Sequence, residues 1–333
     1  MNILKLLALD RFTILLIVMV ILATFLPVSG EPAKVFGVIT NIAIAILFFL
    51  HGAKLSRQAI VEGILHWKLH VVVFAFTFAL FPIIGLLAKP VLLPMLGEQL
   101  YLGFLFMCFL PSTVQSSIAF TSVAKGNVAA AVCSASFSNL VGMFITPVLV
   151  SLFIFGQSKH DYDPTSSIIE ITLLLLVPFI AGQLLRPYVF PLMQKAPSIV
   201  KTFDQGTILM VVYGAFSGAV VTGLWQQVSW LTLFNLTLIC SVFLTVIMLL
   251  AWYIPKWLGF NRPDQIAVFF CGSKKTLASG VPMAQILFAG QPLGMIVLPI
   301  MIFHQIQLMV CGVIANYWSK QDTEEYIGEE AAE

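Results

Sequence analysis

The chain has 333 residues, of which 59% are hydrophobic and 10% charged, and its mean hydropathy is +1.00. Soluble domains carry about a quarter charged residues, so this composition excludes a soluble globular protein. The formal net charge of +2 gives no reason to expect nucleic acid as a partner. All five cysteines lie in apolar stretches without a CxxC or a zinc-type spacing, so neither a disulfide nor a structural metal is predicted.

Ten apolar stretches follow one another along the chain, and most could cross a bilayer as a helix of about 17–25 residues. They cover residues 12–28, 35–52, 69–88, 100–124, 127–155, 166–190, 205–224, 230–254, 265–288 and 293–318. The first stretch lacks a small-residue cleavage pattern, so we expect a retained helix and not a signal peptide. The connecting segments are too short for a soluble domain with its own core. The sequence therefore predicts an all-α integral membrane protein with one transmembrane domain over residues 1–333.

Lysine and arginine are unevenly distributed between the two sets of connecting segments. With the N-terminus inside, the inside segments hold twelve of the seventeen residues and the outside segments three, while Lys274 and Lys275 lie within the ninth stretch. Cytoplasmic loops carry the excess of these residues in membrane proteins. We therefore expect both termini, including an acidic tail at 319–333, to be cytoplasmic.

The stretches form two halves of five, 12–155 and 166–318, joined by a polar segment that begins at Gly156. Because each half has an odd number of spans, the second half enters the membrane from the opposite side, as in the inverted repeats of many secondary transporters. The fourth stretch of each half is interrupted by polar residues and followed by a short turn. Matching interruptions in two halves indicate a binding site.

In the fourth stretch, Pro111 is followed by five polar side chains, namely Ser112, Thr113, Gln115, Ser116 and Ser117. On a continuous helix these would cover roughly 200°, at about 100° per residue, and part of that arc would face lipid. Proline also lacks a backbone donor, so a locally unwound chain that lines a cavity explains the pattern better. The alternative is that the hydroxyls bond back to their helix or join neighbouring helices.

The ninth stretch contains the polar run Ser273, Lys274, Lys275 and Thr276. Lys274 lies about 15 Å into the stretch, near the midplane of a ~30 Å hydrocarbon core. An ionisable residue at that depth indicates a functional site, the alternative being a packed or snorkelled lysine. None of the fifteen acidic residues lies at mid-depth, so an anionic solute, aided by half-helix N-termini, could supply the missing charge. Alternatively, one lysine is neutral and takes part in proton coupling.

Two further stretches carry polar residues within the membrane. The fifth has Ser134, Ser136, Ser138 and Asn139, and the tenth has His304, Gln305 and Gln307. Of these, Ser134, Ser136 and His304 are candidate site residues. His304 could relay a proton or contact a solute, or it could simply bond to a neighbouring helix.

Four long strings resemble the bile acid:sodium symporter superfamily, and within it a bacterial symporter branch that is also similar to the seventh member of vertebrate solute carrier family 10. They are FFLHGAKLSRQAI at 48–60, LPSTVQSSIAFTSVAKGNVAAAVCSAS at 110–136, FFCGSKKTLASGVPMA at 269–284 and LPIMIFHQIQLMVCG at 298–312. The likeness runs from about residue 10 to 320. It implies ten helices in an inverted repeat, a panel domain of helices 1, 2, 6 and 7, a core domain of the others, and discontinuous helices 4 and 9 that cross at the midplane.

The resemblance also implies sodium ligands, namely a Ser-Asn pair on helix 4, hydroxyls on helix 5 and a Glu with a following Gln on helix 9. In this chain the pair aligns with Ser117 and Ile118, and Phe269 or Phe270 stands in place of the glutamate. We therefore expect no cofactor beyond a coupling ion, either sodium or a proton, and only weak dependence on sodium. A lysine ammonium could replace one sodium ion electrostatically.

Together these observations predict a secondary transporter of the bacterial inner membrane that moves a small organic, anionic solute by alternating access. Its partners would be that solute and the lipid bilayer. One rival is an arsenite-type efflux permease of the same superfamily, for which Cys108 is the residue to examine, and another is a non-transporting regulator of ion homeostasis. An enzyme is not expected, because the sequence has no membrane-embedded Asp pair, HExxH or GxSxG.

Overall fold

The computed structural model describes residues 11–54, 67–155, 177–223, 226 and 228–330, with side chains described as far as Lys320. Regular structure in these ranges is helical, in agreement with the predicted all-α class. The elements are α2 (Arg11–Phe25), α3 (Gly30–Lys54), α5 (Trp67–Ala75), the π-helical turn η1 (Phe76–Leu80), α6 (Phe81–Leu87), α7 (Lys89–Leu96), α8 (Glu98–Phe109), α9 (Gln115–Val123), α10 (Val128–Val150), the π-helical turn η2 (Ser151–Phe155), α12 (Arg186–Lys195), α13 (Pro197–Val221), α15 (Trp230–Trp257), α16 (Arg262–Gly272), α17 (Leu277–Leu287) and α18 (Leu293–Glu330).

Six continuous helices in the described ranges are long and apolar enough to cross a bilayer. They cover Gly30–Lys54, Trp67–Leu87, Val128–Phe155, Pro197–Val221, Trp230–Trp257 and Leu293–Lys320. Two of the other predicted stretches, 100–124 and 265–288, are each divided into two shorter helices. A third, 166–190, is described only from residue 177, and residues 177–184 are helical. The polar segment that joins the predicted halves lies outside the described residues.

The outer face of α15 shows how the bundle meets its surroundings. Apolar side chains are exposed along the whole helix at a spacing of three or four residues, from Phe234 through Leu238 and Val242 to Leu249. Trp230 and Trp257, at the two ends of this stripe, are 87% and 90% exposed. A continuous apolar face of this kind is unusual in soluble monomers, and tryptophans at both ends are typical of membrane–water interfaces. This face of α15 therefore fits contact with lipid.

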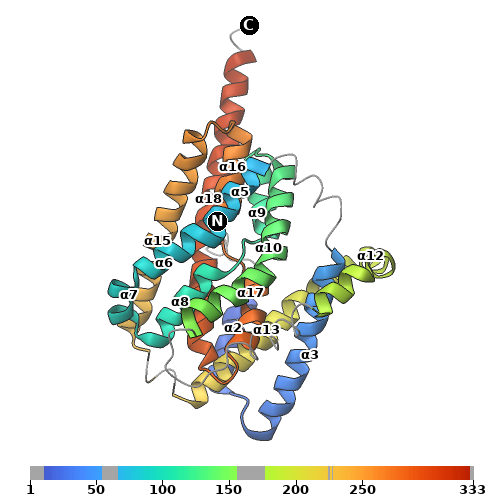
Figure 1. Cartoon of the computed structure of the whole chain (residues 1–333), viewed down its shortest axis with the longest axis vertical. Coiled ribbons are helices and arrows are strands. Elements are labelled where there is room, and N and C mark those ends of the chain that lie inside the picture. The colour runs from blue at the N-terminus through green and yellow to red at the C-terminus, as the bar shows by residue number, and fades with distance from the viewer. Residues whose placement is uncertain (1–10, 55–66, 156–176, 224–225, 227, 331–333) are drawn as a thin grey trace.

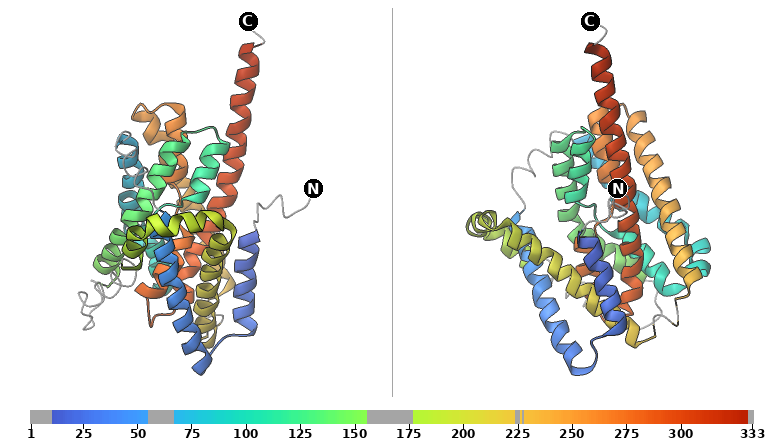
Figure 2. Two further views of the ribbon diagram at one scale, coloured as in Figure 1. Left: turned by 90° about the vertical axis from the view of Figure 1, so that its right-hand side faces the viewer. Right: turned by 180° about the vertical axis from the view of Figure 1, so that it is seen from behind.

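Helix α13 connects two groups of helices. It packs against α2 and α3 on one side and against α17 and α18 on the other. Helices α3 and α12 lie at one side of the molecule and α7 and α15 at the opposite side, while α13 runs obliquely from the middle of the bundle toward α3 and α12 (Figure 1), and the view from behind agrees (Figure 2). The C-terminal part of α18 extends beyond the bundle (Figure 2), so the predicted acidic tail begins as a continuation of the last helix.

Segment 177–184 crosses α3 at two glycines. A Cβ atom on Gly52 would lie 2.0 Å from the Phe179 carbonyl oxygen, and one on Gly182 would lie 1.9 Å from the Phe49 carbonyl oxygen. Any side chain at either position would force the two backbones apart. The absence of side chains therefore permits this crossing, which brings Phe179 next to the cavity described below.

Four phenylalanines from four helices form the aromatic part of the core. The Phe243 ring of α15 lies 5.4 Å from Phe81, 5.0 Å from Phe104 and 6.3 Å from Phe303, measured between ring centroids, and all three pairs meet edge to face. Such pairs add stabilisation beyond the burial of apolar area. The cluster holds α6, α8, α15 and α18 together and fixes the position of Phe81, which contacts the candidate site.

Candidate functional site at the crossing of two broken helices

Two of the predicted membrane-spanning stretches, 100–124 and 265–288, leave the helical conformation partway along. Leu110 is extended, with φ −72° and ψ 153°, and the helix resumes only at Gln115. In the second half α16 ends at Gly272, Thr276 is extended, with φ −82° and ψ 127°, and α17 begins at Leu277. The two breaks touch, because the Thr276 N–H donates to the Pro111 carbonyl at 3.0 Å. We call residues 110–114 and 273–276 together the crossover. The unwound segment predicted at Pro111 is thus confirmed.

The first break leaves five consecutive carbonyl groups, Cys108 to Ser112, to be paired. An unpaired carbonyl in hydrocarbon costs several kcal/mol, so a break of this kind needs partners from other elements. Each of the five has one, and only one of these partners is a backbone group. Cys108 and Leu110 accept from the Lys275 ammonium, Phe109 from the Thr146 hydroxyl, Pro111 from the Thr276 N–H and Ser112 from the Asn139 amide.

The second break is paired in the reverse direction. The Ser112 hydroxyl donates to the Cys271 carbonyl at 2.6 Å, and the Ser117 hydroxyl donates to the Phe270 carbonyl at 3.0 Å. These are the last carbonyls of α16, which have no partner within their own helix. The polar residues of each break therefore satisfy the helix end at the other break.

Lys275 is fully buried, with 0% of its surface exposed. Its ammonium donates to the carbonyls of Thr77, Cys108 and Leu110 at 2.7, 2.8 and 2.7 Å, and it lies 4.1 Å from the centroid of the Phe81 ring. The backbone of Lys275 is paired as well, because the Gln307 amide accepts from its N–H at 3.0 Å and donates to its carbonyl at 2.9 Å. Gln307 thus completes the pairing of the second break.

Lys274 is also fully buried, but its surroundings differ. Its ammonium donates to the Ser116 carbonyl at 2.9 Å and lies 4.2 Å from the ring centroid of Phe120 and 5.1 Å from that of Phe270. Aromatic faces attract cations, so these two rings help to compensate for the lost hydration of the ammonium. Both ion pairs found among the described residues lie elsewhere, at Lys34–Glu31 and Lys54–Asp204.

A cavity of about 440 Å³ lies beside the crossover, between the broken helices and α3 and α13. Ligand pockets typically enclose about 300–1,000 Å³. Six of the predicted site residues line it, namely Thr113, Gln115, Ser116, Ser136, Thr276 and His304. The other six do not line it, namely Ser112, Ser117, Ser134, Ser273, Lys274 and Lys275. Neither lysine side chain lines this cavity. The Lys275 ammonium binds the carbonyls of Thr77, Cys108 and Leu110, and the Lys274 ammonium binds the Ser116 carbonyl of α9.

The opposite side of the cavity was not predicted. It includes His51 and Lys54 of α3 and Lys201 and Asp204 of α13, and Lys54 forms an ion pair with Asp204. Lys54 and Lys201 are two of the twelve lysine and arginine residues counted in the inside segments, and that count assigns them no other role. The available signal was the string at 48–60, which contains both His51 and Lys54.

The two helices that begin at the crossover, α9 and α17, lack the side-chain caps that several other helices have at their N-termini. Side chains of Asn127, Ser229 and Asn261 cap the first turns of α10, α15 and α16. No side-chain hydrogen bond caps α9 or α17, and residues of both first turns line the cavity. The first N–H groups of a helix lack intrahelical partners and carry the positive end of its dipole. Two such ends at one cavity favour an anionic group there.

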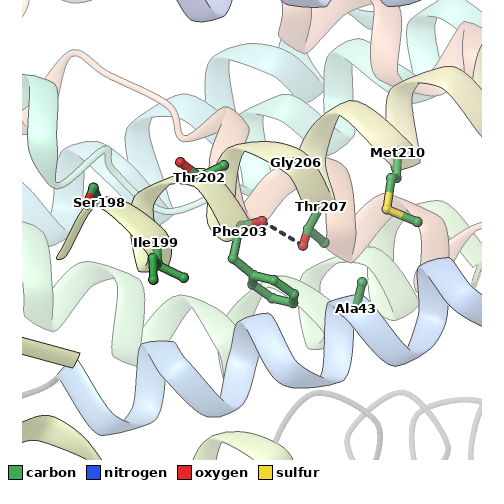
Figure 3. Close-up of a pocket in the computed structure, with 8 residues that line it drawn as sticks. All are labelled: Ala43, Ser198, Ile199, Thr202, Phe203, Gly206, Thr207 and Met210. Atoms are coloured by element: carbon green, nitrogen blue, oxygen red, sulfur yellow. Dashed lines mark hydrogen bonds between the residues drawn. The ribbon is translucent and has the colours of Figure 1, made fainter. Parts of the chain in front are cut away.

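Other hollows lie along α13. A groove of about 620 Å³ between α3 and α13 is lined by Ala43, Ser198, Ile199, Thr202, Phe203, Gly206, Thr207 and Met210 (Figure 3). No charged side chain lines it, and the Thr207 hydroxyl donates to the Phe203 carbonyl of its own helix. A further hollow of about 610 Å³ lies toward the other ends of α3 and α13. Neither contains residues of the crossover, so the 440 Å³ cavity is the candidate site.

Cys108 is fully buried and packs against Gly85, and it does not line the candidate cavity. Its contribution to the crossover is its carbonyl oxygen, which Lys275 binds. Among the described residues, no group of three or more His, Cys, Asp and Glu side chains could hold a metal ion. The contacts of Cys108 therefore give no support to the arsenite permease hypothesis.

A bundle of apolar helices, with two broken helices meeting beside a polar cavity, has the architecture of a membrane transport protein. The chain belongs to the SBF-like CPA transporter family, whose profile matches residues 10–320. This confirms the resemblance noted from the sequence. The family is one of transporters, in keeping with the expectation that the chain is not an enzyme.

Three relatives illustrate the range of the similarity. An uncharacterized protein of Pseudomonas aeruginosa, PA2026, is 55% identical over 312 residues, which cover 94% of this chain and 93% of the relative. A protein of Escherichia coli named "Putative symporter YfeH" is 48% identical over 317 residues, covering 94% of each chain. The sodium/bile acid cotransporter 7-B of Xenopus laevis is 28% identical over 326 residues, covering 94% of this chain and 93% of the relative.

Gln307 allows a test of how strongly the second break depends on its partner. We expect Gln307→Ala to lower the free energy of unfolding by about 1–3 kcal/mol, because it removes a buried amide that pairs both backbone groups of Lys275. The measurement is thermal unfolding of the purified protein in detergent. The matched control is Asn316→Ala, an exposed amide on the same helix that donates to the Gly312 carbonyl. Equal shifts for the two variants would contradict the assignment.

Proposed function

We propose that the chain is a secondary transporter that moves a small organic anion across the membrane by alternating access. The observation that carries the proposal is the cavity beside the crossover, formed by both broken helices on one side and by α3 and α13 on the other. Membership of a transporter family supports it. So do the names of two relatives, one called a symporter and the other a sodium/bile acid cotransporter.

The two sides of the cavity suggest the chemistry of the solute. The side formed by the broken helices and α10 is rich in hydroxyls and amides, including Thr113, Thr276 and Asn139. The opposite side combines the charged groups of α3 and α13 with apolar surface, for example Phe48 and Phe179. A solute with an apolar body and a polar, charged end would satisfy both sides.

The sign of that charge follows from the groups around the cavity. Lys54, Lys201 and one carboxylate, Asp204, line it, and Asp204 is already paired with Lys54. Lys201 and the uncapped first turns of α9 and α17 therefore leave the cavity with an excess of positive potential. This favours a carboxylate or a similar anionic group on the solute.

Movement of the solute requires the cavity to open alternately to each side. We infer ten spans in an inverted repeat, in which α8 and α9 of the first half correspond to α16 and α17 of the second. Helices α2, α3, α12 and α13 would form one body and the broken helices with α10 and α18 the other. The contacts of α13 with α17 and α18 would then be the sliding interface.

Uptake by purified protein in lipid vesicles tests the function directly. Across a panel of small organic anions, we expect saturable uptake of at least one that changes little when sodium is replaced by N-methylglucamine. The physical reason is that Phe269 or Phe270 occupies the place of the family's sodium-binding glutamate. The panel is measured with sodium and pH varied independently, and protein-free vesicles serve as the control. A steep sodium dependence with more than one ion per cycle would contradict the coupling proposal.

Ala278 offers a test of the anion preference. It lies in the first turn of α17, is exposed and lines the cavity. We expect Ala278→Asp to weaken binding of the transported anion by about tenfold or more, because like charges repel in a site of low dielectric constant. Folding should not suffer, since an acidic residue in a first turn stabilises a helix.

The control for this experiment is Ala278→Asn, which has nearly the same shape as the aspartate without its charge. Binding is measured by titration calorimetry with the anion identified in the uptake panel. Thermal unfolding of both variants shows whether they are intact. Equal affinities of the Asp and Asn variants would show that the cavity does not select for negative charge.

We also propose that the protein lies in the inner membrane of a bacterium with both termini in the cytoplasm. The excess of lysine and arginine in one set of connecting segments supports this orientation. A reporter enzyme that is active only in the cytoplasm, fused to the C-terminus, should therefore be active. A reporter that is active only in the periplasm, fused at the same position, is the control. Its activity would show that the orientation is the reverse of the one proposed or that the number of spans is not ten.

A further inference from the structure

The surroundings of the Lys275 ammonium have the composition of a cation site. Its three hydrogen-bond acceptors are backbone carbonyls, those of Thr77, Cys108 and Leu110, at 2.7 to 2.8 Å. These are typical lengths for hydrogen bonds from a charged nitrogen. The face of the Phe81 ring covers a further side at 4.1 Å. Converging carbonyl oxygens are also the groups with which channel filters replace the hydration shell of a monovalent cation.

The carbonyl of Thr77 is available because of the backbone around Pro82. In the π-helical turn η1 the Phe81 N–H donates to the Phe76 carbonyl, five residues earlier. In the same register the Thr77 carbonyl would pair with residue 82, but Pro82 has no N–H. A π-turn followed by proline therefore leaves this carbonyl free to bind another donor.

The other two carbonyls come from the end of a broken helix. Cys108 lies in the last turn of α8, and Leu110 lies just beyond it, so neither carbonyl has the partner that a continuous helix would provide. The C-terminal end of a helix also carries the negative end of its dipole. All three carbonyls are thus freed by irregularities in other helices and do not depend on Lys275 for their existence. Together they form a site with negative potential.

We propose that the carbonyls of Thr77, Cys108 and Leu110, with the Phe81 ring, form a binding site for a monovalent cation, and that the chain fills this site with its own Lys275 side chain. The ammonium is a tethered ion that cannot dissociate. If the chain is a transporter as proposed above, the positive charge at this position is present throughout the cycle. It does not have to be provided by an ion that moves down its gradient. Removal of the side chain should leave a site that takes up a soluble alkylammonium ion.

Lys274 provides a matched comparison within the same break. It is as deeply buried as its neighbour, and its ammonium also touches aromatic rings. However, it donates to one carbonyl, that of Ser116, where Lys275 donates to three. Removal of Lys274 should therefore open a space with little power to bind a cation.

The experiment compares Lys275→Ala, Lys274→Ala and the unchanged protein by thermal unfolding in detergent at constant ionic strength. The probe is propylammonium, which has the four heavy atoms that the alanine substitution removes from lysine. Propanol has nearly the same shape without charge, and tetramethylammonium has charge without an N–H donor. We expect propylammonium to raise the unfolding temperature of Lys275→Ala by about 2–4 °C in a saturable manner. The other two proteins and the other two compounds should show no saturable rise.

Two results would overturn the proposal. One is no saturable effect of propylammonium on Lys275→Ala, and the other is an equal effect of propanol or an equal effect on Lys274→Ala. If Lys275→Ala does not fold, Lys275→Met decides, because it keeps the length of the side chain and removes the charge. We expect this variant to unfold at a lower temperature than Lys274→Met, and equal or higher stability would falsify the proposal.

This test needs no transported solute. A negative result would leave the transport proposal standing, and a failure to find uptake would leave the cation site standing.

Discussion

A backbone carbonyl without a hydrogen bond is costly in hydrocarbon, and a helix that breaks inside a membrane exposes several of them. In this protein the two breaks reduce this cost by exchanging hydrogen bonds with each other. Hydroxyls of Ser112 and Ser117 bind the last carbonyls of α16, and the Lys275 ammonium binds carbonyls at the end of α8. Each break thus takes part of its partners from the other break, and α10 and α18 supply the rest through Thr146, Asn139 and Gln307. The positions of α8, α9, α16 and α17 follow from this exchange.

The same exchange divides the polar residues of the crossover between two tasks. Side chains such as Ser117 and Lys275 are used to pair the backbone, and they lie behind the cavity surface. Neighbours on the same segments, Gln115 and Thr276, line the cavity. Lys275 and Thr276 are adjacent in an unwound segment, which can present neighbouring residues to opposite sides, whereas Gln115 and Ser117 lie about 200° apart on the first turn of α9. The two breaks therefore form one side of the cavity, and they also supply hydrogen bonds that satisfy backbone groups exposed by the breaks themselves.

The sequence was sufficient to predict where the helices break, because Pro111 and the run from Ser273 to Thr276 are strong local signals. It could not predict which hydroxyls face the cavity, because the groups that bind the others lie far away along the chain. The Ser112 hydroxyl donates to the Cys271 carbonyl, 159 residues away, and the Ser117 hydroxyl donates to the Phe270 carbonyl, 153 residues away. The carbonyl of Thr77 gives no side-chain signal at all. Charge counting predicts orientation, but it treats Lys54 as a loop residue, although α3 extends to this position and brings it to the cavity.

The breaks also set the direction of the local fields. Each one divides a helix dipole into two, so that a C-terminal and an N-terminal end face each other across a few residues. At the first break the C-terminal end of α8 faces the Lys275 ammonium, whereas the first turn of α9 lines the cavity. The first turn of α17 lines it as well. Negative helix ends thus hold a fixed cation on one side of the crossover, and positive ends face a space suited to an anion on the other. The fixed charge can raise the potential in the cavity through the low-dielectric protein without touching the solute, and it need not move when the solute does.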